Sequence, residues 1–168
     1  MNLCSKYKPL YISELECNYP SILENLNNNS TFIINGPKYS GKSTIIKLYL
    51  DYYNYDYLLI EDFNLSNDNL IEKIKYKTKS VFSYFNNKKY IIVIDNFELF
   101  NKTVKNFIIE NVNKCNFILI TNKYLNIKIN YVRINAYSTD YILNLYNIIY
   151  FLETGYNCKN IQRFENIY

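Results

Sequence analysis

The sequence of 168 residues contains no histidine, only three glycines and only two arginines. Without histidine, a Ser-His catalytic triad, a histidine-ligated metal and acid–base catalysis by imidazole are excluded. Arg133 and Arg163 are also few for a small-molecule kinase, since such enzymes usually clamp phosphate groups with several arginines. Two of the three glycines, Gly36 and Gly41, lie in one stretch of nine residues, 36–44. This concentration singles out that stretch as a candidate site.

The four cysteines show no paired spacing, which argues against a zinc ribbon and against a dithiol redox motif. They are Cys4, Cys17, Cys115 and Cys158, and we interpret them as buried or incidental thiols in a reducing compartment. No apolar run reaches the roughly eighteen residues of a membrane span, and the N-terminus lacks the apolar stretch of a signal peptide. We therefore expect an intracellular protein, in the cytoplasm or nucleus, that is not secreted and has no membrane partner.

The net charge of +4 permits an acidic partner such as nucleic acid, although a mild excess of lysine more often serves solubility. Lysines occupy every second position from Lys73 to Lys79, with Tyr76 and Tyr84 nearby. Alternate spacing spreads side chains around a helix rather than along one stripe, which favours a solvated face over a DNA-binding face.

Short apolar runs alternate with helical patterns along the chain, which predicts crossover units and a mainly parallel sheet. Strands are predicted at residues 31–35, 57–61, 90–95, 116–121 and 131–134. Helices are predicted at residues 19–30, ending in an Asn-rich turn, and at residues 42–54, 66–85, 99–113 and 138–153. The sheet pattern stops near Ala136, so we expect an α/β fold with five strands before that point.

The stretch GPKYSGKST matches the pattern G-x-x-x-x-G-K-[ST], between a predicted buried strand and a predicted helix. Glycines let the backbone N–H groups curl around phosphate oxygens, and the helix N-terminus adds its partial positive charge. We expect Lys42 to bridge the outer phosphates and the Ser43 hydroxyl to bind Mg²⁺. The alternative is a chance turn at a helix start. The residues predicted to form the phosphate site are Gly36, Pro37, Lys38, Tyr39, Ser40, Gly41, Lys42, Ser43 and Thr44.

Polar residues end two further predicted strands. Asp95 ends the strand at 90–95, where a carboxylate that assists magnesium binding lies in P-loop proteins, although Asp95 would alternatively cap the following helix. Asn122 follows the strand at 116–121. It either bonds a γ-phosphate or the attacking water, or it simply starts a turn.

In this order and near these spacings, the motifs resemble the AAA+ ATPase core, most closely that of clamp-loader small subunits of the replication factor C type. The resemblance rests on KYKPLYISEL, ILENL, FIINGPKYSGKST, IIVIDNFE and NFILITN. It covers roughly residues 6–152. It implies a three-layer P-loop NTPase domain in residues 1–136, followed by the start of a small helical lid in residues 137–168.

The same resemblance implies ATP and Mg²⁺ as cofactors, other AAA+ subunits as partners in a hetero-oligomer, and DNA reached through that assembly. Tyr7 and Pro9 would lie against the adenine. Asp95 would be the acid on the metal side, and Asn122 would be the sensor of the terminal phosphate.

Departures from the family pattern predict slow hydrolysis. The acidic strand end normally reads Asp-Glu, but here Asn96 follows Asp95. An amide positions water without accepting its proton, so catalysis would need Glu98 or Glu61 to reach in. The Ser-Arg-Cys segment that supplies an arginine finger is missing after Asn122, where the chain reads KYLNIKIN.

Two further departures concern the lid and the loop. The rest of the lid and the collar would lie beyond Tyr168, and Arg163 comes too early for the sensor arginine of the lid. The bulkier residues PKYS replace the usual PPGT, which the motif tolerates. The chain is therefore either an ATPase that hydrolyses ATP weakly by itself or a non-hydrolysing, ATP-bound structural or regulatory subunit.

Overall fold

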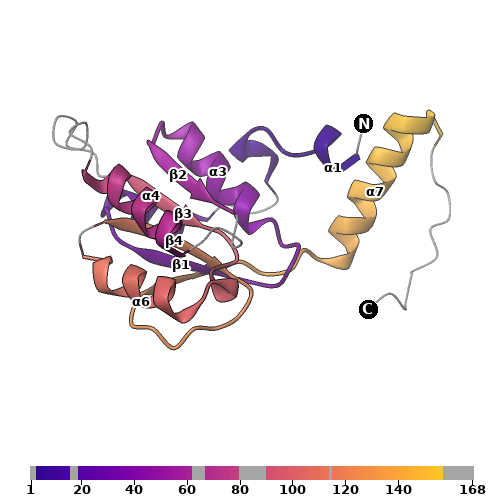
Figure 1. The fold of residues 1–168 in the computed structure, drawn as a ribbon. Coiled ribbons are helices and arrows are strands. Elements are labelled where there is room, and N and C mark those ends of the chain that lie inside the picture. Colours follow the sequence, from indigo (N-terminus) through magenta and orange to yellow (C-terminus); the bar gives the residue numbers. More distant parts are fainter. Residues whose placement is uncertain (1–2, 16–18, 62–66, 80–89, 114, 157–168) are drawn as a thin grey trace. The chain divides into compact units, whose positions relative to one another are not determined.

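The computed structural model describes residues 3–15, 19–61, 67–79, 90–113 and 115–156. The chain divides into a larger unit, Pro9–Asn135, and a smaller one that combines Met1–Lys8 with Ala136–Tyr168. Figure 1 shows the strands and most helices in the larger unit. The sequence places the first eight residues in the nucleotide-binding domain, whereas here they group with the C-terminal unit.

A five-stranded sheet forms the centre of the larger unit, and every neighbouring pair of strands in it is parallel. Its order is β2-β3-β4-β1-β5. The strands are β1 (Phe32–Asn35), β2 (Tyr57–Ile60), β3 (Ile91–Ile94), β4 (Asn116–Thr121) and β5 (Asn130–Arg133). Each lies within one residue of its predicted bounds at either end, so the predicted α/β fold with a five-stranded parallel sheet is confirmed.

Helices precede β1 and connect β1 to β2, β2 to β3 and β3 to β4. They are α2 (Pro20–Asn27), α3 (Lys42–Tyr52), α4 (Asn67–Lys79) and α6 (Lys102–Asn111), with 3₁₀ turns η1 (Ile12–Glu14) and η2 (Phe97–Leu99). The predicted helix at 99–113 begins later, because η2 comes first and the side chain of Asn101 accepts a hydrogen bond from Val104 N at the helix start. The end of the predicted helix at 66–85 lies outside the described residues.

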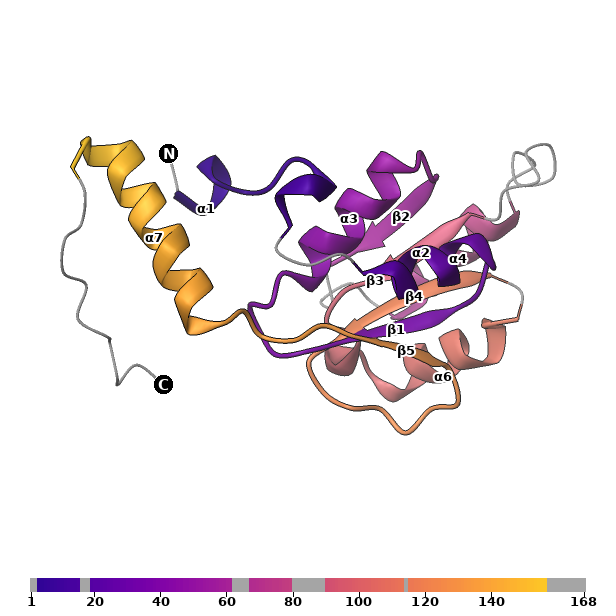
Figure 2. The ribbon, with the colours of Figure 1, turned by 180° about the vertical axis from the view of Figure 1, so that it is seen from behind.

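The alternation of side chains along each strand divides the hydrophobic core into two layers. Phe32 and Ile34 of β1 pack on one face of the sheet with Ile46 of α3, whereas Ile33 packs on the other face with Ile108 of α6. Helices α2 and α3 cover the first face, and α4 and α6 cover the second, an arrangement that Figure 2 shows from behind. The predicted three layers are therefore present.

The strand order places a crevice beside the end of β1. The chain leaves β1 towards β2, past β4 and β3, but it leaves β4 in the opposite direction, past β1, to reach β5. The segments that follow the adjacent strands β1 and β4 therefore diverge. In open parallel sheets, ligands bind at such a reversal, outside the carboxyl ends of the strands.

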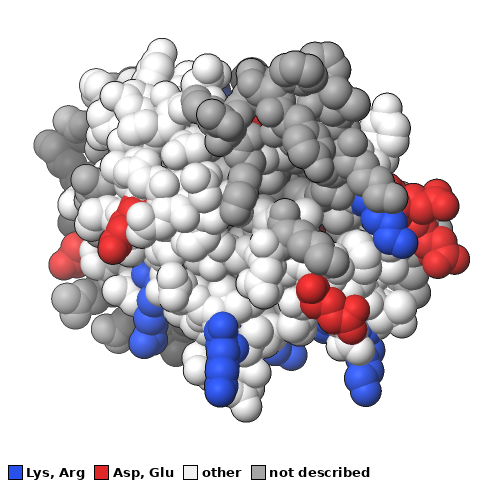
Figure 3. All heavy atoms as spheres, turned by 90° about the vertical axis from the view of Figure 1, so that its left-hand side faces the viewer, with Lys and Arg blue, Asp and Glu red and all other residues white. Residues whose placement is uncertain are grey.

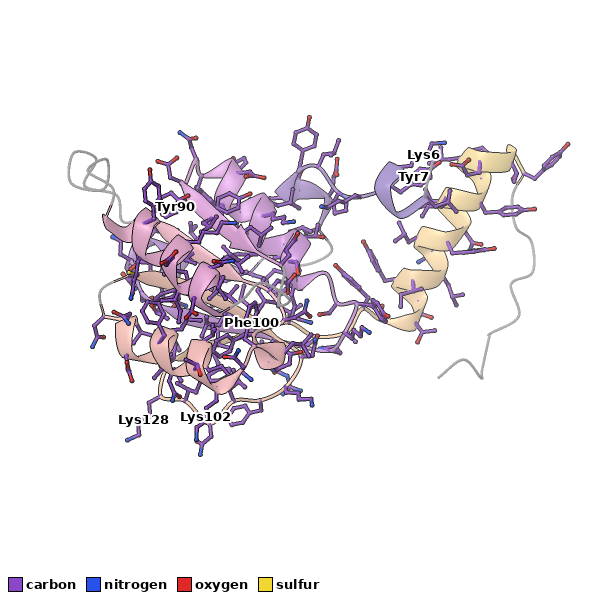
Figure 4. The ribbon with its side chains drawn as sticks, in the orientation of Figure 1. Lys6, Tyr7, Tyr90, Phe100, Lys102 and Lys128 are labelled. Carbon is purple, nitrogen blue, oxygen red and sulfur yellow. The ribbon has the colours of Figure 1, made fainter. Side chains whose placement is uncertain are left out.

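The smaller unit contains α1 (Leu3–Lys6) and α7 (Thr139–Thr154). Near the end of α7, Glu153 accepts a hydrogen bond from the hydroxyl of Tyr7 at 2.6 Å and pairs with Lys6 at 2.7 Å. Figure 4 shows Lys6 and Tyr7 beside the last turns of α7. None of the residues of α7 is buried. Within the described residues, no helix has the length and hydrophobicity that a bilayer span demands.

Gly36 is required by close packing rather than by its backbone conformation. A Cβ atom at this position would lie 2.2 Å from the carbonyl oxygen of Ile134, and the adjoining backbone is held by the 2.8 Å hydrogen bond from Ile134 N to Asn35 O. We expect Gly36→Ala to lower the free energy of unfolding by about 1 to 3 kcal/mol, as measured by urea denaturation.

The matched control is Gly155→Ala, whose Cβ would meet no atom within 4 Å although its φ is +75°. Its expected cost is backbone strain of about 1 kcal/mol at the end of α7, with the larger unit unaffected. Equal loss of stability of the larger unit in both variants would contradict the packing role of Gly36.

Candidate nucleotide-binding site

The segment between β1 and α3 forms a tight loop over the crevice. Gly41 precedes the first turn of α3 with φ +78°, a left-handed conformation that glycine adopts without strain. Tyr39 takes the same region with φ +66° while 87% of its surface stays exposed. Ser40 is buried, and its hydroxyl donates to the carbonyl of Pro37 at 2.9 Å, which fixes the bend.

The ammonium group of Lys42 lies inside this loop, with only 6% of the residue exposed. It donates to the carbonyl oxygens of Gly36 at 3.0 Å and Pro37 at 2.6 Å, and to Asn122 Oδ1 at 2.8 Å. Burial lowers the pKa of this ammonium group, and the negative charges of Asp95 and Glu98 offset part of that shift. A cation held among neutral acceptors in this way is suited to bind an anionic phosphate.

Ser43 and Asp95 meet beside Lys42, as the sequence predicts. The hydroxyl of Ser43 donates to Asp95 Oδ2 at 2.5 Å, and Asp95 Oδ1 accepts from Asn96 N at 2.8 Å. The alternative in which Asp95 caps the next helix is wrong, because Asn101 is the cap of α6. Asp95 instead turns its carboxylate towards the loop.

The oxygens of Ser43 and Asp95 fit Mg²⁺ that arrives with a nucleotide. Among the described residues, no cluster of three acidic, cysteine or histidine side chains is placed to hold a metal ion by itself. Mg²⁺ is commonly bound through one or two protein oxygens together with phosphates and water. One hydroxyl and one carboxylate in contact therefore match a Mg·nucleotide complex better than a resident metal.

Asn122 follows β4 and links two charged groups. Its Oδ1 accepts from Lys42, and its Nδ2 donates to Glu98 Oε1 at 2.7 Å. Burial acts to raise the pKa of Glu98, but hydrogen bonds from its own backbone N–H and from Asn122 outweigh it, so the pKa lies below its ordinary value. Asn122 therefore does more than start a turn.

A pocket of about 270 Å³ opens over these groups. It is slightly smaller than sites that enclose a whole small-molecule ligand, roughly 300 to 1,000 Å³, and it suits the phosphate part of a nucleotide. Its lining residues are Lys38, Tyr39, Gly41, Lys42, Ser43, Thr44, Asp95, Asn96 and Asn122. The phosphate loop, Asp95 and Asn122 are thus brought together from the ends of three strands.

The remaining predicted site residues lie elsewhere. Glu98 is outside the lining and reaches the pocket through Asn122. Glu61 pairs with Lys47 at 2.8 Å. Tyr7 belongs to the smaller unit, and Pro9 is not among the residues that line the pocket. The adenine contacts of Tyr7 and Pro9 remain predictions.

The lysine-rich helix α4 shows no basic stripe in its described part. Lys73 and Lys75 are exposed, and Lys75 Nζ lies 5.7 Å from the centre of the Phe107 ring. On the face drawn in Figure 3, the visible basic side chains stand apart from one another. This distribution agrees with the solvated face that the spacing predicts.

No known family model matches the sequence, and no curated protein matches it. A chain in a structure of Drosophila ORC bound to AT-rich DNA and Cdc6 has a similar fold, with a TM-score of 0.50. The shared fold is a three-layer α/β fold with a parallel sheet. The two chains are 10% identical over 74% of this chain. This chain spans 56% of the Drosophila chain, and the likeness concerns the fold alone.

The backbone gives Asn96 a role that sequence reasoning missed, because the sequence shows only that a glutamate is absent. Asn96 has φ +50° and ψ +43°, a left-handed conformation that asparagine adopts more readily than other residues with a Cβ atom. We expect Asn96→Ala to lower the free energy of unfolding by about 1 kcal/mol and Asn96→Gly to leave it nearly unchanged. Equal urea midpoints for these two variants would contradict this explanation.

Proposed function

We propose that this chain is an AAA+-type subunit that binds Mg·ATP at the loop Gly36–Thr44. The observation that carries the proposal is the convergence of Lys42, Ser43, Asp95 and Asn122 on one pocket. Lys42 supplies positive charge for the outer phosphates, and Ser43 with Asp95 supplies oxygen ligands on the metal side. These roles match a nucleoside triphosphate with its Mg²⁺.

The same lining supports the proposal that the chain alone hydrolyses ATP slowly. Among the described residues of the lining, Asp95 is the one carboxylate, and it is hydrogen-bonded to Ser43. Asn96, which follows it, has no basic atom to take a proton from water. The described lining also contains no arginine to neutralise charge on the transferred phosphoryl group.

For its cellular role, we propose a clamp-loader-like subunit in an intracellular assembly that acts in DNA replication. Other AAA+ subunits would supply the missing arginine, and DNA would be contacted through the assembly. Support comes from the motif order and from the fold shared with a chain in a structure of Drosophila ORC bound to AT-rich DNA and Cdc6. The second candidate, favoured by Asn96, is an ATP-bound structural or regulatory subunit that does not hydrolyse its nucleotide.

Titration calorimetry with Mg·ATP tests nucleotide binding. Lys42→Ala removes a charge-assisted contact and is expected to weaken binding about 10-fold to 100-fold. Removing Mg²⁺ with EDTA is expected to weaken binding by the wild type. Lys47→Ala is the matched control, because Lys47 lies on the same helix but pairs with Glu61. No binding by the wild type at millimolar ATP would contradict the proposed function.

Phosphate release tests the catalytic part. Asn96→Glu introduces a side chain that can accept a proton from water and is expected to raise the rate at least tenfold. Asn96→Gln is the matched control, with the same length but no basic atom. Fast turnover by the isolated wild type would contradict slow hydrolysis.

The same assay with primed DNA and candidate partner subunits separates the two cellular roles. Stimulated release by the wild type would favour the ATPase. Unchanged background release in every mixture, with ATP still bound, would favour the non-hydrolysing subunit.

A further inference from the structure

Glu98 accepts hydrogen bonds from Asn122 from outside the pocket lining. Its Oε1 accepts from the side-chain nitrogen of Asn122 at 2.7 Å and from the backbone nitrogen of Asn122 at 3.3 Å. The carboxylate also belongs to η2, which packs on β4. It is therefore anchored beside Asn122 by the chain itself and does not depend on a bound ligand.

The two charges around Asn122 fix the orientation of its amide. The oxygen faces the ammonium of Lys42 at 2.8 Å, and the nitrogen faces the carboxylate of Glu98 at 2.7 Å. Rotating the amide by half a turn would place nitrogen against the cation and oxygen against the anion, losing two charge-assisted hydrogen bonds. Asn122 is thus held in one of its two orientations.

This orientation bears directly on how the site recognises phosphate. A phosphate oxygen accepts hydrogen bonds, so Asn122 can bind it only through nitrogen. In the structure that nitrogen donates to Glu98, while the oxygen of Asn122 holds Lys42. The nitrogen keeps a second N–H for a phosphate oxygen, but Glu98 fixes the direction in which the amide points. All three N–H bonds of the Lys42 ammonium are already used, so a terminal phosphate must compete with Asn122 for the ammonium.

We propose that Glu98 is a positioning residue that lowers the preference of this site for a nucleoside triphosphate over the diphosphate. The inference rests on the proposed function. Glu98 holds the amide in the orientation in which its oxygen occupies the Lys42 ammonium, and the negative charge of Glu98 repels the additional charge that the terminal phosphate carries. Both effects are expected to bear on the terminal phosphate more than on the inner ones.

The second carboxylate oxygen supports a role beyond packing. Glu98 Oε2 is buried and has no hydrogen-bond partner among the described residues. A carboxylate that served only the fold would be expected to have both oxygens satisfied, because a buried unpaired acceptor is costly.

The experiment compares the affinities for Mg·ADP and for the Mg²⁺ complex of a non-hydrolysable ATP analogue by calorimetry. Glu98→Gln keeps the shape of the side chain and removes its charge, and Glu98→Ala removes the contact as well. We expect both to raise the triphosphate preference about fivefold to tenfold. The control Glu61→Gln removes a carboxylate that pairs with Lys47 and is expected to leave the preference unchanged.

An Asn122→Ala background shows whether Glu98 acts through the amide. If it does, Glu98→Gln is expected to lose most of its effect there. Equal changes in affinity for both nucleotides, or a lower triphosphate preference in Glu98→Gln, would overturn the inference while leaving nucleotide binding intact. Failure of the wild type to bind either nucleotide would overturn the proposed function and this inference together.

Discussion

The pairing of β1 with β4 is the contact on which the site depends. In this register Asn35 lies opposite Thr121, so the phosphate loop and Asn122 leave the sheet at the same level. The next pair, β4 with β3, then brings Asp95 to the same edge. A shift of one residue in the β1–β4 register would reverse the faces of the strand and separate Lys42 from Asn122.

Much of the site was predictable because its signals are local. The phosphate loop is one continuous motif, and long β-branched runs mark buried strands, as in β3 and β4. The contact between Glu98 and Asn122 was not predictable, because it spans 24 residues and depends on the strand order. Two further features have no signal in the local sequence. They are the left-handed backbone of Asn96 and the grouping of the first eight residues with α7.

The polar groups of the site largely satisfy one another. Lys42 has three oxygen acceptors, Ser43 bonds Asp95, and Asn122 bridges Lys42 and Glu98. Such a network is stable by itself and must be rearranged when a ligand enters. Part of the binding energy from phosphate and Mg²⁺ is therefore used to replace existing contacts. This favours moderate affinities that differ little between nucleotides over very tight binding.

Helix α7 is stabilised by contacts at its ends, whereas the sheet is stabilised by burial. None of its 16 residues is buried, so opening it uncovers little additional apolar surface. Its ends are fixed by the Ser138 cap, by Gly155 and by the contact of Glu153 with Lys6 and Tyr7. A helix of this length is marginal in water by its backbone alone. Its amide hydrogens should therefore exchange with solvent long before those of β1 and β4.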